Sequence, residues 1–390
     1  MDLDFSKLDA YLDETGHDGY LIEADSEDSD QYYLSGFDAP DPFVTLYDGE
    51  VHLLFARSLE FGRAKRESRA ATVERYVDFD HTAYVEEHGR DDASSYVIRD
   101  FLDSYGVESV AVPPRFPLEV ADGLRERGRT VAADREETVT GIRATKTDTE
   151  VDHVRTAQRA NEAAMATAEE LIADAEVREG TLYHDGDPLT SEAVRTEIEV
   201  TLLRHGCALD ETIVACGSDA ADPHDRGSGP LLADEPIIID IFPRDKETKY
   251  HADMTRTFCR GEPGDTVQDW FELTDEAKEA ALAAVEPGVT GEAVHDAACD
   301  VYERAGMPTL RADESAETGF IHSTGHGVGL DVHELPHVSP GGETLEPGHV
   351  ITIEPGLYDP DVGGVRIEDI VVVTEDGYEN LTDYPVELVV

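Results

Sequence analysis

The feature that most constrains this chain is a set of four short apolar runs, typical of buried strands, that each carry an acidic residue. They are Ile237–Phe242 with Asp240, His251–Arg260 with Asp253, Val350–Glu354 with Glu354, and Val365–Val373 with Glu368. A carboxylate in a sheet core costs several kcal/mol unless it is paired or bound to a metal. One such residue is more often part of a salt bridge. These strands hold too few Lys and Arg to neutralise four, so divalent cations are the economical counter-charge.

A glycine loop, Ile321–Glu334, adds three histidines within twelve residues: His322, His326 and His333. Glycines on both sides of His326 allow close backbone approach. The pattern is not HExxH, which excludes a zinc site on a single helix. A lone histidine here would more often be structural, but three beside strand carboxylates favour one ligand and two reaction-facing groups. Asp331 and Glu334, in the same loop, are expected to be solvated acids without a role.

Strand geometry relates these residues to one another. The turn-rich stretch Pro243–Lys249 separates Asp240 from Asp253, and a hairpin there would bring both onto one face. Arg366 and Glu368 are two residues apart in one predicted strand and therefore point the same way. We expect Arg366 to hold a metal-ligating carboxylate in place.

In five motifs, the chain resembles the methionine aminopeptidase/prolidase superfamily, the "pita-bread" metallopeptidase family M24. In chain order they are Asp240, Asp253 in Asp-Met-Thr-Arg-Thr-Phe, His326 in Gly-His-Gly, Glu354 in Ile-Glu-Pro-Gly and Glu368 in Arg-Ile-Glu-Asp. The N-terminal half, with Tyr33-Leu34-Ser35-Gly36-Phe37, is similar to the creatinase/prolidase N-terminal domain. Methionine aminopeptidases lack that domain, so the resemblance points to the Xaa-Pro branch (prolidase and aminopeptidase P).

The resemblance implies an α+β protein with two domains. Residues 1–145 would form a creatinase/prolidase-like α/β domain, and residues 146–390 a pita-bread catalytic domain. Two divalent ions are implied, with Mn²⁺ preferred and Co²⁺, Zn²⁺ or Fe²⁺ as alternatives. In the implied ligand set, Asp240 chelates one ion, Asp253 and Glu368 bridge both, and His326 and Glu354 complete the other.

The resemblance also implies catalytic roles for the cleavage of proline-containing di- or oligopeptides. Glu354 would move the proton from the nucleophile to the leaving amine. His224, in Asp-Pro-His-Asp, and His333 would donate hydrogen bonds to the substrate carbonyl. His322 would line the proline pocket. Dipeptidase and aminopeptidase remain open, as do two alternatives: a lyase or amidinohydrolase of the same fold, and a non-catalytic peptide-binding relative.

Apolar periodicity and turn residues predict the remaining elements. Helices are expected over 5–14, 59–69, 93–105, 149–175, from Thr190 or Ser191, over 267–285 and over 292–305. Strands are expected over 20–22, 76–79 and 107–112, and over 43–47 and 51–55 as a hairpin around Asp48-Gly49. The first half shows no evident cluster of catalytic side chains.

Charge and composition exclude several partners. The formal net charge is −56, which argues against nucleic-acid binding and against docking on an anionic membrane. Only six of the 31 basic residues are Lys, and together with the acidity this indicates a salt-saturated cytoplasm. The four cysteines have no CxxC spacing, and no apolar stretch reaches the length of a membrane span. We expect a cytoplasmic protein without a secretion signal and, from the resemblance, a homodimer.

Overall fold

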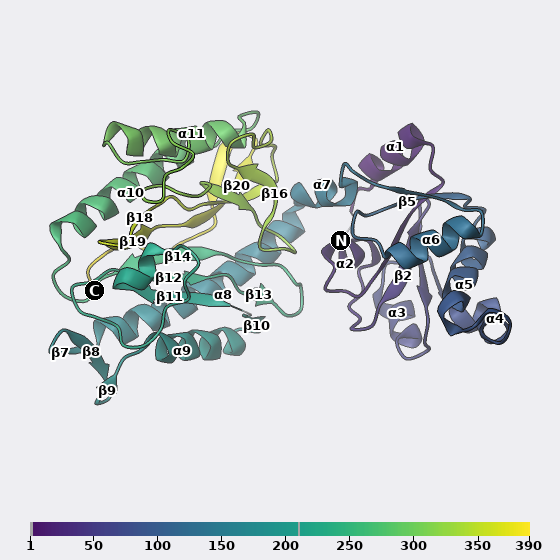
Figure 1. Ribbon diagram of the computed structural model, residues 1–390, viewed down its shortest axis with the longest axis horizontal. Coiled ribbons are helices and arrows are strands. Elements are labelled where there is room, and N and C mark those ends of the chain that lie inside the picture. Colours follow the sequence, from purple (N-terminus) through teal and green to yellow (C-terminus); the bar gives the residue numbers. More distant parts are fainter. Residues whose placement is uncertain (1–2, 210) are drawn as a thin grey trace. The chain divides into compact units, whose positions relative to one another are not determined.

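The computed structural model describes residues 3–209 and 211–390, which form two compact units, residues 1–143 and 144–390. Each combines helices with a sheet (Figure 1). The prediction of a mixed α and β architecture is therefore confirmed. Among the described residues, no helix combines the length and the apolar composition that a bilayer-spanning segment needs.

The first unit is built on a six-stranded sheet with the order β4-β3-β2-β1-β5-β6. Its strands are β1 (Gly19–Ala24), β2 (Phe43–Tyr47), β3 (Val51–Phe55), β4 (Thr72–Arg75), β5 (Ser109–Val112) and β6 (Thr130–Ala133). Its helices are α1 (Ser6–Thr15), α2 (Ser29–Ser35), α3 (Phe61–Glu67), α4 (His81–His88), α5 (Arg90–Ser104), α6 (Leu118–Glu126) and α7 (Thr138–Ala144). The predicted hairpin is confirmed: β2 and β3 are antiparallel, Tyr47 pairs with Val51, and Gly49 takes a positive φ.

One predicted strand of this unit is wrong. Tyr76–Phe79 forms a single 3₁₀ turn, and the strand is the preceding segment β4, which pairs with β3 in parallel. The Asp78 carboxylate accepts a hydrogen bond from the backbone N–H of Arg75 at 3.0 Å. That bond closes the chain into a turn where the apolar pattern alone suggests extension.

The second unit begins with α8 (Asp148–Ala173), close to the predicted 149–175. The Thr147 side chain accepts from the Glu150 N–H, while the Glu150 carboxylate accepts from the Thr147 N–H, so both groups cap the helix start. Thr190 caps α9 (Ser191–Arg204) in the expected way. Two further helices are α10 (Asp265–Ala283) and α11 (Gly291–Arg304).

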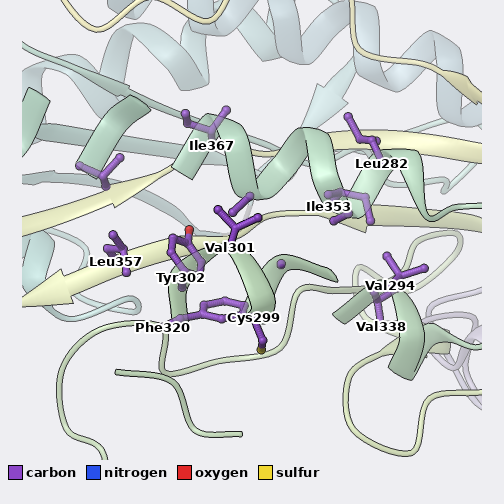
Figure 2. Close-up of a cluster of buried hydrophobic side chains, with 14 of the residues drawn as sticks. Leu282, Val294, Cys299, Val301, Tyr302, Phe320, Val338, Ile353, Leu357 and Ile367 are labelled. Carbon is purple, nitrogen blue, oxygen red and sulfur yellow. The ribbon is translucent and has the colours of Figure 1, made fainter. Parts of the chain in front are cut away.

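Two principal sheets lie between the helix pair α8 and α9 and the helix pair α10 and α11. An antiparallel sheet has the order β11 (Thr212–Cys216), β12 (Ile237–Ile241), β14 (Met254–Phe258), and its apolar face packs with α8 and α9. A five-stranded sheet has the order β16 (Glu334–Val338), β15 (Gly325–Gly327), β17 (Val350–Ile353), β20 (Asp369–Thr374), β21 (Gly377–Asn380). Its core, drawn in Figure 2, packs with α10 and α11. Within this unit, α8 and α9 therefore lie on the opposite side of the strands from α10 and α11 (Figure 1).

Shorter strands complete the unit. They are β7 (Glu176–Arg178), β8 (Thr181–His184), β9 (Asp187–Pro188), β10 (Cys207–Ala208), β13 (Arg244–Asp245), β18 (Gly356–Asp359) and β19 (Gly363–Arg366).

The predicted strand Val365–Val373 is two strands. The chain pairs with β18 up to Arg366 and then with β17 from Asp369 onward. At the break, the Glu368 N–H donates to Thr255 O at 3.0 Å, which ties this point to β14. The change of partner, invisible in the apolar pattern, sets Glu368 at the junction between sheets.

Candidate metal centre

The first wall of the site comes from the antiparallel sheet. Asp240 lies in β12 directly opposite Thr255 of β14. Asp253 immediately precedes β14 and is two residues from Thr255, so side-chain alternation places it on the same face as Asp240. The hairpin geometry expected for these two aspartates is therefore present, although Asp253 lies just outside the strand.

The second wall comes from the five-stranded sheet and its ends. His326 is the central residue of β15, Glu354 directly follows β17, and Glu368 occupies the break before β20. A Cβ at Gly325 would lie 2.0 Å from Thr352 O, and one at Gly327 would lie 2.1 Å from Leu335 O. The two glycines thus permit the close strand approach that holds His326 in place, as expected.

The side chains from the two walls converge. Ligand atoms of Asp253, His326 and Glu368 all lie within 4.8 Å of one another. His326 Nε2 is 3.3 Å from Glu354 Oε1 and 3.7 Å from Asp253 Oδ2. His326 Nδ1 is 3.1 Å from the Gly327 carbonyl oxygen, which can only accept, so Nδ1 carries the proton and the lone pair of Nε2 is available to a cation.

The hydrogen bonding of these carboxylates fits a cation site. Asp240 Oδ1 and Glu368 Oε1 are buried and have no hydrogen-bond partner among the described residues. Burial, reinforced by the neighbouring carboxylates, raises the pKa values of Asp253 and Glu368 well above their ordinary range. A divalent cation would supply the partner that the orphaned oxygens lack and the charge that opposes this repulsion.

Arg366 holds Asp240 and organises the floor of the site. Its guanidinium donates to Asp240 Oδ2 at 2.6 Å, to the Tyr358 hydroxyl at 2.9 Å and to Thr255 Oγ1 at 3.2 Å. Thr255 Oγ1 in turn donates to Glu368 Oε2 at 2.7 Å. The buried guanidinium of Arg366 is therefore linked by hydrogen bonds to a carboxylate from each wall, directly to Asp240 and through Thr255 to Glu368.

His322 lies in the cavity wall with both ring nitrogens engaged. Nδ1 donates to Ser323 O at 2.7 Å, so Nε2 accepts from the Tyr358 hydroxyl at 3.0 Å. Burial lowers the pKa of His322 to about 4, which keeps the ring neutral. The ring can therefore offer a substrate its apolar face but no further hydrogen bond.

These groups line a cavity of about 980 Å³. His224 and His333 also line it, and both are exposed, in contrast to the buried carboxylates. The His333 ring stands edge-on to His326 with centroids 4.2 Å apart. Ile213, Phe242, Ile321 and Val332 contribute apolar surface. The cavity thus joins a buried carboxylate cluster to a mouth with two histidines.

Several polar residues of the site escape the sequence analysis. Thr352 Oγ1 accepts from the His326 N–H at 3.1 Å and donates to Glu354 Oε1 at 3.3 Å. Thr255 and Tyr358 are the two hydroxyl-bearing residues that accept hydrogen bonds from Arg366. Two-residue alternation with Asp253 and Glu354 is the signal that could have found the two threonines. The expectation for Glu334 is wrong: its side chain is 2 % exposed and paired with Lys146.

Comparison with known proteins gives two family matches. Residues 152–375 match "Metallopeptidase family M24", and residues 5–145 match "Creatinase/Prolidase N-terminal domain". The chain is 29 % identical over 388 residues to the Xaa-Pro dipeptidase of Pyrococcus furiosus, covering 98 % of each chain.

Solved structures agree with this. The prolidase from Pyrococcus horikoshii OT3 superposes with a TM-score of 0.78 at 27 % identity, over 98 % of this chain and 99 % of that one. The X-Pro aminopeptidase from Thermotoga maritima gives 0.77 at 27 % identity, over 96 % and 98 %. The fold combines a creatinase-type N-terminal domain with a pita-bread domain. The chain belongs to metallopeptidase family M24 and is a metal-dependent peptidase.

Proposed function

We propose that this protein is an Xaa-Pro peptidase, a dipeptidase or aminopeptidase that cleaves the bond between an N-terminal residue and proline. The observation that carries the proposal is the convergence of Asp253, His326 and Glu368 in a cavity that also holds Asp240 and Glu354. Relatives of similar length are named Xaa-Pro dipeptidase, prolidase and X-Pro aminopeptidase, which supports the substrate class.

In the proposed site, Asp240, Asp253, His326, Glu354 and Glu368 would hold two divalent cations, with Mn²⁺ as the preferred metal. When bound, such cations acidify water and polarise the scissile carbonyl. His326 presents Nε2 because its other nitrogen is committed to Gly327 O. Arg366 holds Asp240 in its ligating position. We also propose residues 1–145 and 146–390 as the domains, with the catalytic machinery in the second.

Proton transfer is assigned to Glu354. Although burial opposes ionisation, the adjacent His326 ring and the buried guanidinium of Arg366 lower the pKa of Glu354 to about 2. The carboxylate is therefore ionised and can accept a proton from the attacking water. It then returns that proton to the proline nitrogen, which must be protonated to leave. Thr352 restrains the carboxylate during both transfers.

Substrate orientation is assigned to the histidines. His224 and His333 lie at the exposed side of the cavity, where an N–H can donate to the substrate carbonyl and to the negative charge that develops on it. His322 would present its ring face to the proline ring, because its nitrogens are occupied. Partial desolvation of the ring and the neighbouring His326 lower the pKa of His333, which favours its neutral form.

A substrate panel tests the proposal. Gly-Pro, Leu-Pro, Met-Pro and Arg-Pro-Pro are incubated with the EDTA-treated protein and then with Mn²⁺ in concentrated KCl. We expect no cleavage after EDTA and restored cleavage with Mn²⁺. Cleavage of the dipeptides alone would indicate a dipeptidase, and cleavage of Arg-Pro-Pro an aminopeptidase. Metal-loaded protein that cleaves none of the four would contradict the proposal.

The amino-acid composition of the protein indicates the salt concentration in which it works. With a net charge of −56 and few Lys, the protein is suited to a salt-saturated cytoplasm, and a homodimer is expected from the resemblance. Unfolding midpoints should rise between 0.1 and 3 M KCl, roughly the range over which the screening length shrinks from about 10 Å to below 3 Å. A midpoint that does not rise would remove the salt hypothesis without touching the peptidase assignment.

A further inference from the structure

A buried ion pair lies behind the turn that carries His333. Lys146 Nζ is 2.5 Å from Glu334 Oε1, and the two side chains are 1 % and 2 % exposed. The residues are 188 positions apart, and neither belongs to the ligand set or to the groups that face the substrate. Withdrawing two charges from water costs several kcal/mol for each ion, and the mutual attraction repays this only when the geometry is well matched.

On the Glu334 side, the carboxylate fills the inside of the turn. A Cβ at Gly329 would lie only 2.1 Å from Glu334 Oε1, so glycine is what lets the carboxylate approach. The Asp331 N–H points to Glu334 Oε2 at 3.4 Å. His333 is the residue between this turn and Glu334 itself, so the carboxylate restrains the backbone on both sides of His333.

On the Lys146 side, backbone hydrogen bonds attach Lys146 to the five-stranded sheet. The Lys146 N–H donates to Gly348 O at 2.9 Å, and the Gly348 N–H donates to Val373 O of β20 at 2.9 Å. Gly348 lies just before β17, the strand that leads to Glu354. The ion pair therefore connects the His333 turn to the sheet that positions the proton-transfer carboxylate.

We propose that Lys146 and Glu334 are positioning residues: their buried ion pair sets His333 relative to His326 and Glu354. The alignment it fixes is the edge-on contact of the His333 and His326 rings, with centroids 4.2 Å apart. The inference rests on the proposed function, because it matters for activity only if His333 acts on the substrate.

Two single variants and their combination test the proposal. Lys146→Met and Glu334→Gln each break the pair by removing one of its two buried charges, so both should lower the thermal midpoint. The double variant removes both charges of the pair, and its midpoint should return toward that of the unchanged protein. Its kcat on a cleaved Xaa-Pro dipeptide should nevertheless stay roughly ten- to a hundred-fold low, because the turn is no longer fixed.

The readouts separate positioning from stability. KM and Mn²⁺ affinity of the double variant should change less than about two-fold, because the metal-binding side chains and His322 are unchanged. If the double variant regains both midpoint and kcat, the pair is only structural and the proposal is overturned. Should it fail to fold, Gly329→Ala moves the carboxylate without removing a charge, and unchanged kcat in that variant overturns the proposal as well.

Two further proteins complete the design. Arg155→Gln breaks the more exposed Arg155–Glu379 pair of the same unit and should change neither kcat nor midpoint appreciably. His333→Ala tests the underlying assumption. If His333→Ala keeps its activity, the role of His333 in the proposed function fails. If it loses activity while the double variant keeps it, only the present inference fails.

Discussion

Asp134 in the first unit and Asp253 in the second are both buried, and they differ in what surrounds them. The Asp134 carboxylate accepts hydrogen bonds from the N–H groups of Glu136 and Thr138, at 3.0 and 2.8 Å, and from the Tyr20 hydroxyl at 3.3 Å. Among the described residues, Asp253 receives no side-chain hydrogen bond and faces other carboxylates instead. A buried carboxylate that accepts hydrogen bonds from nearby groups, as Asp134 does, stabilises the fold. A buried carboxylate that lacks such donors and lies among other carboxylates, as Asp253 does, is suited to binding a cation.

Exchanging these aspartates for asparagine should give the largest difference. Asp253→Asn removes a charge from the ligand cluster, and kcat/KM for a cleaved Xaa-Pro dipeptide should fall on the order of a thousand-fold or more. Bound metal per chain, measured by mass spectrometry, should fall with it. Asp134→Asn is the matched control, which should lower the unfolding midpoint yet keep kcat below that midpoint. Full activity in Asp253→Asn would break the comparison.

The next effect concerns Arg366, whose guanidinium pairs with Asp240 in the carboxylate cluster. Arg366→Met leaves Asp240 buried without its guanidinium partner, and breaking a buried pair in this way costs about 3–5 kcal/mol. We expect the free energy of unfolding of the metal-free protein to fall by that order in urea titrations. Added Mn²⁺ should recover part of the loss by supplying charge to Asp240. A metal-free variant as stable as the unchanged protein would show that Arg366 does not support Asp240.

In the first unit, replacing one buried acidic residue should raise the stability of the fold, and the effect should be smaller than that of replacing Arg366. Glu23 Oε2 is buried without a partner among the described residues, and burial, with Glu119 nearby, raises the pKa of Glu23 from 4.5 to about 7. The folded state therefore holds a proton that the unfolded chain releases, so stability falls as pH rises from about 4.5 to 7. From the shift, the loss is about 3 kcal/mol above pH 7.

Glu23→Gln should abolish this decline and make the first unit more stable at pH 8. Hydrogen exchange of the β1 amides at pH 5 and pH 8 measures it, after correction for the intrinsic exchange rate. Peptidase activity per folded molecule should be unchanged. If the variant and the unchanged protein show the same pH dependence, the carboxyl of Glu23 does not titrate as described.

The smallest effect tests the restraint on Glu354. Thr352→Val removes one hydroxyl that accepts from the His326 N–H and donates to Glu354 Oε1. A single hydrogen bond of this kind is worth about 0.5–1.5 kcal/mol, so kcat should fall roughly three- to ten-fold. Thr352→Ser keeps the hydroxyl and should retain most of the activity. Equal loss in both variants would point to packing rather than hydrogen bonding.

Some elements are predictable from sequence because their causes are local. Helix α8 follows from an apolar period and a cap at Thr147, and the β2–β3 hairpin from Asp48-Gly49 between two apolar runs. The 3₁₀ turn at Tyr76–Phe79 is missed because one side-chain hydrogen bond decides it. The break at Glu368 is missed because it depends on a change of strand partner. The alternation of apolar and polar residues does not show which strand a segment pairs with.

The sequence by itself determined which residue types could form a site: four acids in apolar runs, three histidines in a glycine loop, and the order that resembles family M24. Tertiary structure alone decided their partners. Arg366 meets Asp240 across 126 positions and Lys146 meets Glu334 across 188, while Asp240 Oδ1 and Glu368 Oε1 find no donor in the described part of the chain. The reason is physical: burial cost follows from residue type, but relief of that cost depends on which distant group the folded chain brings within hydrogen-bonding distance.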